Sequence, residues 1–167
     1  MGYNLAELVR LRDWARAGGD EEWKFHLGWW INIGPPLVSR GPGVRTACLA
    51  GGIVLMHGAV PVWEAREGIS GMRCLEVRYR KVLHAVPELA ADILGLESCE
   101  ADLLFDPEPS LFESPRDTAL SFLDDLIVRA EQGLDNLEAR DVEDWVNDNA
   151  DIRESEEEWD SDAYYGR

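Results

Sequence analysis

The chain has 167 residues, a length that suits one compact domain and leaves little room for a second. Hydrophobic residues make up 46% of the sequence, so the chain can form a core, which excludes disorder throughout. Its 16 basic and 33 acidic residues give a formal net charge of −17, which argues against direct binding to nucleic acid or to an anionic membrane surface, because both need positive charge opposite phosphates.

The first predicted helix covers residues 5–17. Asn4 and Glu7 have the spacing of a capping box, and leucines recur at helical intervals after Asn4. Gly18 and Gly19 predict the end of this helix, because glycine readily adopts the left-handed backbone conformation that follows many helices.

Residues 20–45 are rich first in tryptophan and then in glycine and proline. This composition predicts a short aromatic segment, helical or extended, followed by a loop. Thr46 can cap an apolar helix over residues 47–57. The pair Gly51-Gly52 within that helix permits the close approach of another helix or of an aromatic ring.

The stretch from Ala47 to Trp63 contains no charged residue and resembles a membrane span in composition. It has about 17 residues, the lower limit for a span, and His57 and Pro61 interrupt it. We therefore predict a buried core helix here and no contact with a membrane.

The second half of the chain carries helix-start signals at Pro87, Ser98 and the pair Ser114-Pro115. Charged and apolar residues alternate within residues 70–85, so a strand remains an alternative to the helix predicted there. The last helix is weaker, and we expect it either to dock loosely or to bind a partner. The predicted helices cover residues 70–85, 88–94, 99–105, 115–132 and 134–146. Because no substantial sheet is predicted, the expected fold class is mainly α.

The whole charge imbalance lies in the last 71 residues. Residues 1–96 carry 11 basic and 10 acidic side chains, whereas residues 97–167 carry 5 basic and 23 acidic ones. Acidic residues repel one another and oppose compaction. We therefore predict a helical domain over residues 1–132, a weakly docked acidic helix over residues 133–149 and a mobile acidic tail over residues 150–167.

Three motifs appear in a fixed order in the middle of the chain. They are F-x-M/L-G-x-W beginning at residue 25, C-G-T-x-x-C-x-A-G at residues 43–51, and A-x-x-L-G-L-x-x-x-x-A-x-x-L-F at residues 91–105. With these motifs, residues 23–132 resemble an uncharacterised group of small proteins from actinobacteria and their phages. Gly43 replaces the first cysteine of the second motif, and the next two positions also depart from it. The resemblance therefore implies origin and fold class, and it argues against a shared cysteine-pair or metal function.

The cysteines and histidines lack the close spacing of metal ligands. An odd number of cysteines without a CxxC motif predicts reduced, mostly buried thiols, with no metal and no cofactor. The start of the chain is charged and lacks the apolar stretch of a signal peptide, so we expect a cytoplasmic protein, in the host cytoplasm if a phage encodes it. The three cysteines are Cys48, Cys74 and Cys99, and the three histidines are His26, His57 and His84.

The sequence does not predict an enzyme. Paired carboxylates such as Asp124-Asp125 are expected on solvated helix faces, whereas acid–base catalysis needs carboxylates held in a cleft. Arg45-Thr46 at an expected helix start offers a place for an anion, but we favour a plain cap and connector. We therefore expect no catalytic residues.

Tryptophans occur in two sets that call for different interpretations. Most of the set in the first 63 residues is expected in the core: Trp14, Trp23, Trp29, Trp30 and Trp63. The second set lies among acidic residues, where the sequence offers no core, so these side chains are candidate anchors for a partner. The predicted partner-binding residues are Glu143, Asp144, Trp145, Asp148, Asp151 and Trp159. A passive, solubilising tail is the alternative.

These observations favour a non-enzymatic interaction protein. We expect a phage accessory factor that binds and inhibits a host protein with a basic surface, through an acidic surface that mimics nucleic acid. One alternative is a small-ligand binder or enzyme that uses the Trp-rich segment and the Arg45-Thr46 helix start. Another is a virion or assembly component held by contacts between copies.

Overall fold

A computed structural model gives the structure of the protein and describes residues 2–28, 30–34, 43–65, 72–107 and 114–150. The helices are α1 (Leu5–Arg16), α2 (Leu49–Met56), α3 (Val86–Leu94), α4 (Ser98–Phe105) and α5 (Pro115–Glu131). Residues 139–150 are also helical. The strands are β1 (Lys24–Phe25), β2 (Ile31–Ile33), β3 (Arg45–Ala47), β4 (Val60–Ala65), β5 (Met72–Tyr79) and β6 (Val82–Ala85).

The described strands form one six-stranded mixed sheet, so the protein has an α/β fold and the prediction of a mainly α fold is wrong. The segment predicted as a helix over residues 70–85 supplies β5 and β6, because its alternation of polar and apolar residues has the two-residue period of a strand. The strands β1, β2 and β3 have two or three residues each, too few to show a period in the sequence.

The sheet is built around β5. Its strand order is β1-β3-β2-β5-β4, and β6 also pairs with β5. β4 runs along one side of β5, so β2 and β6 share the other side: β2 pairs with residues 72–74 and β6 with residues 76–79. All pairs are antiparallel except β1 with β3. β5 and β6 therefore form a hairpin that extends beyond the short strands.

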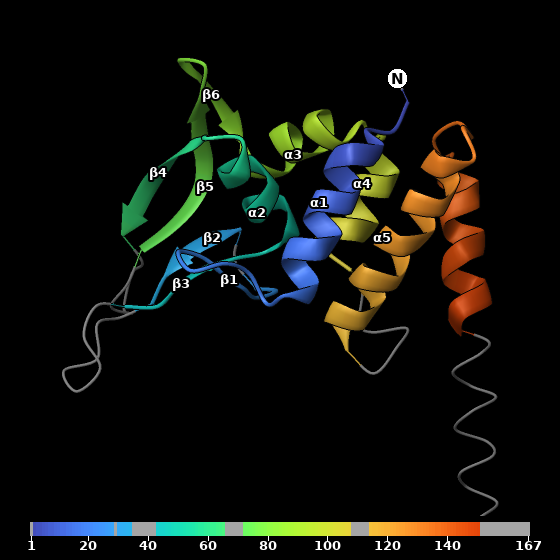
Figure 1. Cartoon of the computed structure of the whole chain (residues 1–167), viewed down its shortest axis with the longest axis horizontal. Helices are drawn as coiled ribbons and strands as arrows, with labels where there is room; N and C mark the ends of the chain where they lie inside the picture. Colours follow the sequence, from blue (N-terminus) through green and yellow to red (C-terminus); the bar gives the residue numbers. More distant parts are fainter. Residues whose placement is uncertain (1, 29, 35–42, 66–71, 108–113, 151–167) are drawn as a thin grey trace, which may run out of the picture.

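The sheet lies at one end of the molecule and the helices at the other (Figure 1). α2 and α3 lie next to the sheet, α1, α4 and α5 follow, and residues 139–150 form the outermost helix (Figure 1). The core between these layers is apolar, and its largest fully buried side chains include Leu8, Leu11, Ile53, Phe122 and Leu123.

Gly52 explains how α1 can approach α2. A Cβ atom at this position would lie 2.6 Å from Cζ3 of Trp14, closer than any side chain tolerates. The prediction that the pair Gly51-Gly52 permits close approach of an aromatic ring is thus confirmed. The absence of a side chain lets the Trp14 ring pack directly on the α2 backbone.

Several predicted helix ends are confirmed. α1 is followed by Gly18 and Gly19, both with positive φ. α3 contains Pro87 in its first turn and ends at Gly95 in the left-handed conformation. α5 begins after Ser114, whose side chain accepts a hydrogen bond from the Asp117 amide.

Other predicted caps are wrong. Thr46 lies in β3, and Cys48 rather than Thr46 precedes α2. The Asn4 side chain donates to the Ile93 carbonyl instead of capping α1. Ser98 is the first residue of α4, and Glu97 caps that helix.

The predicted acidic helix over residues 133–149 packs against the body in the described residues. Leu137 and Val142 are buried, and Trp145 is half-buried. The tail predicted over residues 150–167 lies outside the described residues, except for residue 150.

Candidate functional site

A groove of about 420 Å³ lies between α5 and residues 139–150. α5 contributes Asp125, Val128 and Arg129, which are three and four residues apart and so share one helix face. The facing helix contributes residues at the same spacing, namely Asp141, Asp144, Trp145 and Asp148. Leu137, which precedes that helix, also lines the groove. We call this site the acidic groove, since four carboxylates and one guanidinium line it.

Trp145 is held in place within the acidic groove. Its ring packs edge-on against Phe122, with ring centroids 4.9 Å apart. Its indole Nε1 donates a hydrogen bond of 2.6 Å to Asp125 Oδ2. The sequence suggested that Trp145 had no core to join, and this is corrected: α5 provides one. A fixed indole is a better anchor than a free one, because less side-chain entropy is lost on binding.

The structure brings together three of the six predicted partner-binding residues. Asp144, Trp145 and Asp148 line the acidic groove. Glu143 is exposed on the same helix but does not line the groove. Asp151 and Trp159 lie outside the described residues. The groove also contains Asp125 and Asp141, which sequence reasoning did not assign to a site.

A buried carboxylate fixes the segment that leads into this groove. Glu100 is fully buried and accepts hydrogen bonds from Tyr3 Oη at 2.5 Å and from the Leu137 amide at 2.8 Å. It also accepts from Asn136 Nδ2 at 2.8 Å and from the Glu97 amide at 2.9 Å. Four donors satisfy the acceptor oxygens of this buried side chain. Glu100 therefore joins the N-terminus, α4 and the segment before the outermost helix.

Sequence reasoning missed Glu100, although a signal was present. Glu97 and Glu100 have capping-box spacing, and both reciprocal hydrogen bonds of that box are formed. The capping role could have been predicted from this spacing. The contacts to Tyr3 and Leu137 could not, because they join residues about a hundred and about forty positions away.

Tyr3 remains a hydrogen-bond donor at ordinary pH. Burial of its hydroxyl, followed by its hydrogen bond to Glu100, raises the pKa of Tyr3 to about 12, although Arg129 acts in the opposite direction. Arg129 itself donates to the Asp135 carbonyl at 2.9 Å and to Tyr3 Oη at 3.4 Å. Arg129, which lines the acidic groove, is therefore connected to Glu100 through the Tyr3 hydroxyl.

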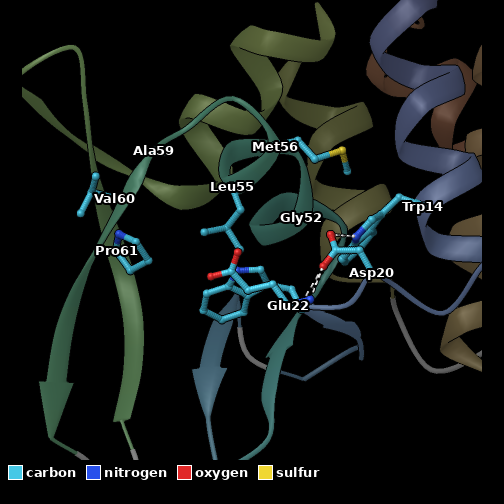
Figure 2. A pocket seen from close by; sticks show the side chains of 10 residues that line it. Trp14, Asp20, Glu22, Gly52, Leu55, Met56, Ala59, Val60 and Pro61 are labelled. Atoms are coloured by element: carbon cyan, nitrogen blue, oxygen red, sulfur yellow. Dashed lines mark hydrogen bonds between the residues drawn. The ribbon is translucent and has the colours of Figure 1, made fainter.

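A second pocket, of about 280 Å³, is lined by Trp14 and Trp23, both buried. Figure 2 shows Trp14, Asp20 and Leu55 around it. Asp20 Oδ2 accepts from Trp14 Nε1 at 2.9 Å, and Asp20 Oδ1 accepts from the amides of Glu22 and Trp23 at 2.8 Å each. Burial raises the pKa of Asp20, but these hydrogen bonds outweigh it and leave the pKa below its usual value. Leu55 supplies an apolar wall. We call this site the tryptophan pocket.

Arg45 borders the tryptophan pocket without forming an anion site at a helix start. It lies in β3, pairs with Glu22 at 2.9 Å and places its guanidinium 5.6 Å from the centre of the Trp23 ring. Trp23 in turn stacks on Trp63. The expectation of Arg45-Thr46 at the beginning of a helix is wrong, because the strand ends before α2 begins.

The expected core tryptophans are largely where they were predicted. Trp14 and Trp23 are buried, and Trp30 and Trp63 are half-buried against the core. Trp29 lies outside the described residues.

The thiols have the character of buried side chains. Cys48 and Cys74 are buried, whereas Cys99 is only half-buried. Burial raises the pKa of Cys48 to about 11 and also raises the pKa values of Cys74 and Cys99. Thiols with raised pKa values remain protonated at neutral pH and are poor nucleophiles.

His57 and two aspartates pair with other side chains of the same chain. His57 Nε2 lies 2.9 Å from Glu7 Oε2, Asp124 pairs with Arg16, and Asp125 accepts from Trp145. Among the residues that the structure describes, no group of three or more His, Cys, Asp or Glu side chains is placed to hold a metal ion. No described helix is long and apolar enough to cross a membrane.

No protein-family model matches this chain, and no curated protein or solved structure shows significant similarity to it.

Proposed function

We propose that this protein is a non-enzymatic interaction protein that binds a partner with a basic surface in its acidic groove. The observation that carries the proposal is the groove itself. It gathers Asp144, Trp145 and Asp148 opposite Asp125 around a partly apolar floor. Such a combination suits a protein partner, because an aromatic anchor supplies affinity and the surrounding charges supply specificity and rate of association.

The charges in the groove form a regular array. Asp141, Asp144 and Asp148 recur on one helix face, about 5 Å apart along the helix axis. Phosphates on one nucleic-acid strand also form a closely spaced row of negative charges. We propose that the partner's basic surface is one that ordinarily binds nucleic acid, and that occupation by this protein inhibits it. If a phage encodes the chain, that partner is a host protein in the host cytoplasm.

A second candidate function is small-ligand binding in the tryptophan pocket. The supporting observation is the ionised Asp20 beside Trp14 and Trp23. A carboxylate next to aromatic faces suits a small organic cation, such as a methylated amine. Tetramethylammonium should then quench tryptophan fluorescence saturably in the parent protein and not in Asp20→Asn. Quenching without saturation, or unchanged in the variant, would contradict this second candidate.

The first proposal is tested by capture of a host protein on the immobilised chain, with a charge-reversed groove as the comparison. In Asp144→Lys/Asp148→Lys the like charges face the partner, so we expect at least about a tenfold loss of affinity. Asp92→Lys/Asp102→Lys is a matched control, because it changes the net charge equally at exposed positions of α3 and α4.

The outcome separates three possibilities. Loss of the captured protein in the groove variant alone supports the acidic groove as the binding site. Equal loss in both variants shows that net charge, rather than the groove, attracts the partner. Unchanged capture in both variants contradicts the proposal.

A further inference from the structure

The hairpin of β5 and β6 projects from the sheet at the end of the molecule opposite the outermost helix (Figure 1). Tyr79 pairs with Val82, so the turn between the strands consists of Arg80 and Lys81 alone. Neither the core nor the acidic groove uses this turn, and its conformation is unusual for its sequence.

Both turn residues have positive φ, 49° for Arg80 and 68° for Lys81. They are the only described residues other than glycine with this conformation. A two-residue hairpin turn favours Asn-Gly or Gly-Gly, because those residues adopt positive φ readily. Two long cationic side chains therefore occupy positions where other residues would form the turn with less strain. Strain of this kind is a reason to look for a binding role.

The hairpin is basic and its exposed side chains are in part apolar. Between residues 72 and 83 there are four basic side chains and one acidic side chain. Register places Arg78 between Val60 of β4 and Leu83 of β6, which are 61% and 50% exposed. Val82, beside the turn, is 55% exposed. The hairpin thus presents positive charge next to uncovered aliphatic side chains.

The acidic groove is complementary to this surface in both respects. It is lined by four carboxylates, and Val128 on its α5 wall is 46% exposed. The two surfaces lie at opposite ends of the molecule, so they cannot meet within one copy (Figure 1). We propose that the β5–β6 hairpin of one copy docks in the acidic groove of a second copy, so that the chain associates head to tail.

This association joins two different surfaces and is not self-complementary. A bound pair still presents one free hairpin and one free groove, so the contact generates rings or open chains rather than a closed twofold dimer. The inference rests on the groove of the proposed function, since a docked hairpin occupies the site offered to the partner. Concentrated protein should therefore bind its partner less well per chain than dilute protein.

The first experiment measures the molar mass of the full chain by sedimentation equilibrium over a wide range of concentration. At an ionic strength of about 0.01 M, charges act over about 30 Å, and we expect the mean mass to rise with concentration beyond that of a dimer. At about 1 M salt, where the screening length is about 3 Å, association should weaken at least about tenfold.

The second experiment removes the hairpin cations without straining the fold. Arg80→Asn/Lys81→Gly supplies the residues that the turn prefers, so the variant should melt at a temperature equal to or above that of the parent. It should nevertheless lose association by about tenfold or more, since two of the cations that face the groove are gone. A loss of association without a loss of stability cannot be attributed to misfolding.

A charge exchange tests that the two surfaces meet. Arg80→Glu/Lys81→Glu and Asp144→Lys/Asp148→Lys should each fail to associate alone. Mixed together they should associate, because the acidic hairpin of the first variant then faces the basic groove of the second. The unchanged basic hairpin of the second variant can also dock in the unchanged acidic groove of the first.

Four results would overturn the proposal. They are a parent chain that stays monomeric at low salt, association that survives Arg80→Asn/Lys81→Gly, mixed variants that stay apart, and a labelled DNA duplex or RNA that binds the parent but not the hairpin variant. Capture of the partner should survive Arg80→Asn/Lys81→Gly, so failure of this proposal can be told from failure of the proposed function.

Discussion

Glu100 is a fully buried carboxyl side chain, and its four hydrogen bonds decide whether that arrangement is stable. Replacement by alanine removes the acceptor of the Tyr3 hydroxyl and of the Glu97 amide. It also removes one of the two acceptors of the Asn136 side-chain amide and of the Leu137 amide. Removing one side of a buried, charge-assisted cluster is costly because the remaining donors stay desolvated.

We therefore expect Glu100→Ala to lower the free energy of unfolding by about 3 kcal/mol in a denaturant titration. Asp102→Ala, on the exposed side of the same helix, is the control and should change it by about 0.5 kcal/mol or less. Equal stability of the two variants would show that Glu100 does not hold the fold together.

Tyr3 makes the free energy of unfolding depend on pH in the alkaline range. Its pKa is about 12 in the folded protein, against 10.0 for an unperturbed tyrosine. Because the pKa of Tyr3 is higher in the folded than in the unfolded chain, its protonated hydroxyl contributes fully to the free energy of unfolding below pH 10. This contribution is lost as the pH rises toward 12, because the tyrosinate forms more readily in the unfolded chain.

The measurement is the denaturation midpoint of the parent and of Tyr3→Phe across this pH range. The parent should lose more stability than the variant, since phenylalanine has no proton to lose. Parallel curves would contradict the assignment of the effect to Tyr3.

At the scale of elements, the outermost helix contacts the body through Trp145 as well as through the buried Val142. Trp145→Ala removes the ring packed on Phe122 and the hydrogen bond to Asp125. We expect a loss of about 2 kcal/mol for this half-buried side chain, below the usual range for a fully buried one.

Amide hydrogen exchange locates the effect of Trp145→Ala. Residues 139–150 should exchange much faster, whereas α1 should retain its protection. Trp145→Phe, which keeps a ring against Phe122, should behave more like the parent. If residues 139–150 stay protected in the alanine variant, other contacts attach this helix.

Elements with strong local signals could be predicted from the sequence, and elements defined by distant pairing could not. α5 was predicted over residues 115–132 and covers Pro115–Glu131, because Ser114 and Pro115 fix its start and its apolar face repeats at helical intervals. The sheet was missed because β2 is a strand only through its pairing with β5, some forty residues later in the sequence. A three-residue strand has no pattern of its own to recognise.

The candidate sites also combine residues that the sequence indicates locally with residues that only the packing of distant elements brings in. Asp144, Trp145 and Asp148 were selected from the sequence as an aromatic residue among acids, and they do share one groove. The contribution of Asp125 could not be foreseen, because it depends on how α5 packs against residues 139–150. The alternative of a ligand site in the Trp-rich segment placed Arg45-Thr46 at a helix start, whereas the tryptophan pocket depends on the turn at Asp20.

At the scale of the whole molecule, the charge is unevenly distributed: residues 1–96 are nearly neutral, with 11 basic and 10 acidic side chains, whereas residues 97–167 are strongly acidic, with 5 basic and 23 acidic ones. The acidic residues of the C-terminal half repel one another, and this repulsion opposes the compact state. Raising the ionic strength from about 0.01 M to about 0.15 M shortens the screening length from about 30 Å to about 8 Å, so the melting temperature should rise.

Calorimetry at several concentrations of sodium chloride checks this expectation. Asp144→Lys/Asp148→Lys should show a smaller rise than the parent, because fewer charges remain to be screened. A melting temperature that falls with salt would show that attractive ion pairs outweigh the repulsion.

The hydrogen bond between the Leu137 amide and Tyr3 joins residues separated by 134 positions. During synthesis the N-terminal partner is made first, and at about 5–20 residues per second the ribosome needs roughly 7 to 27 seconds to reach the other. Until then Glu100 and Tyr3 lack a main-chain donor that they have in the finished protein. A ribosome stalled just after residue 131 should therefore carry a nascent chain that is more easily digested by protease than one stalled well beyond residue 150.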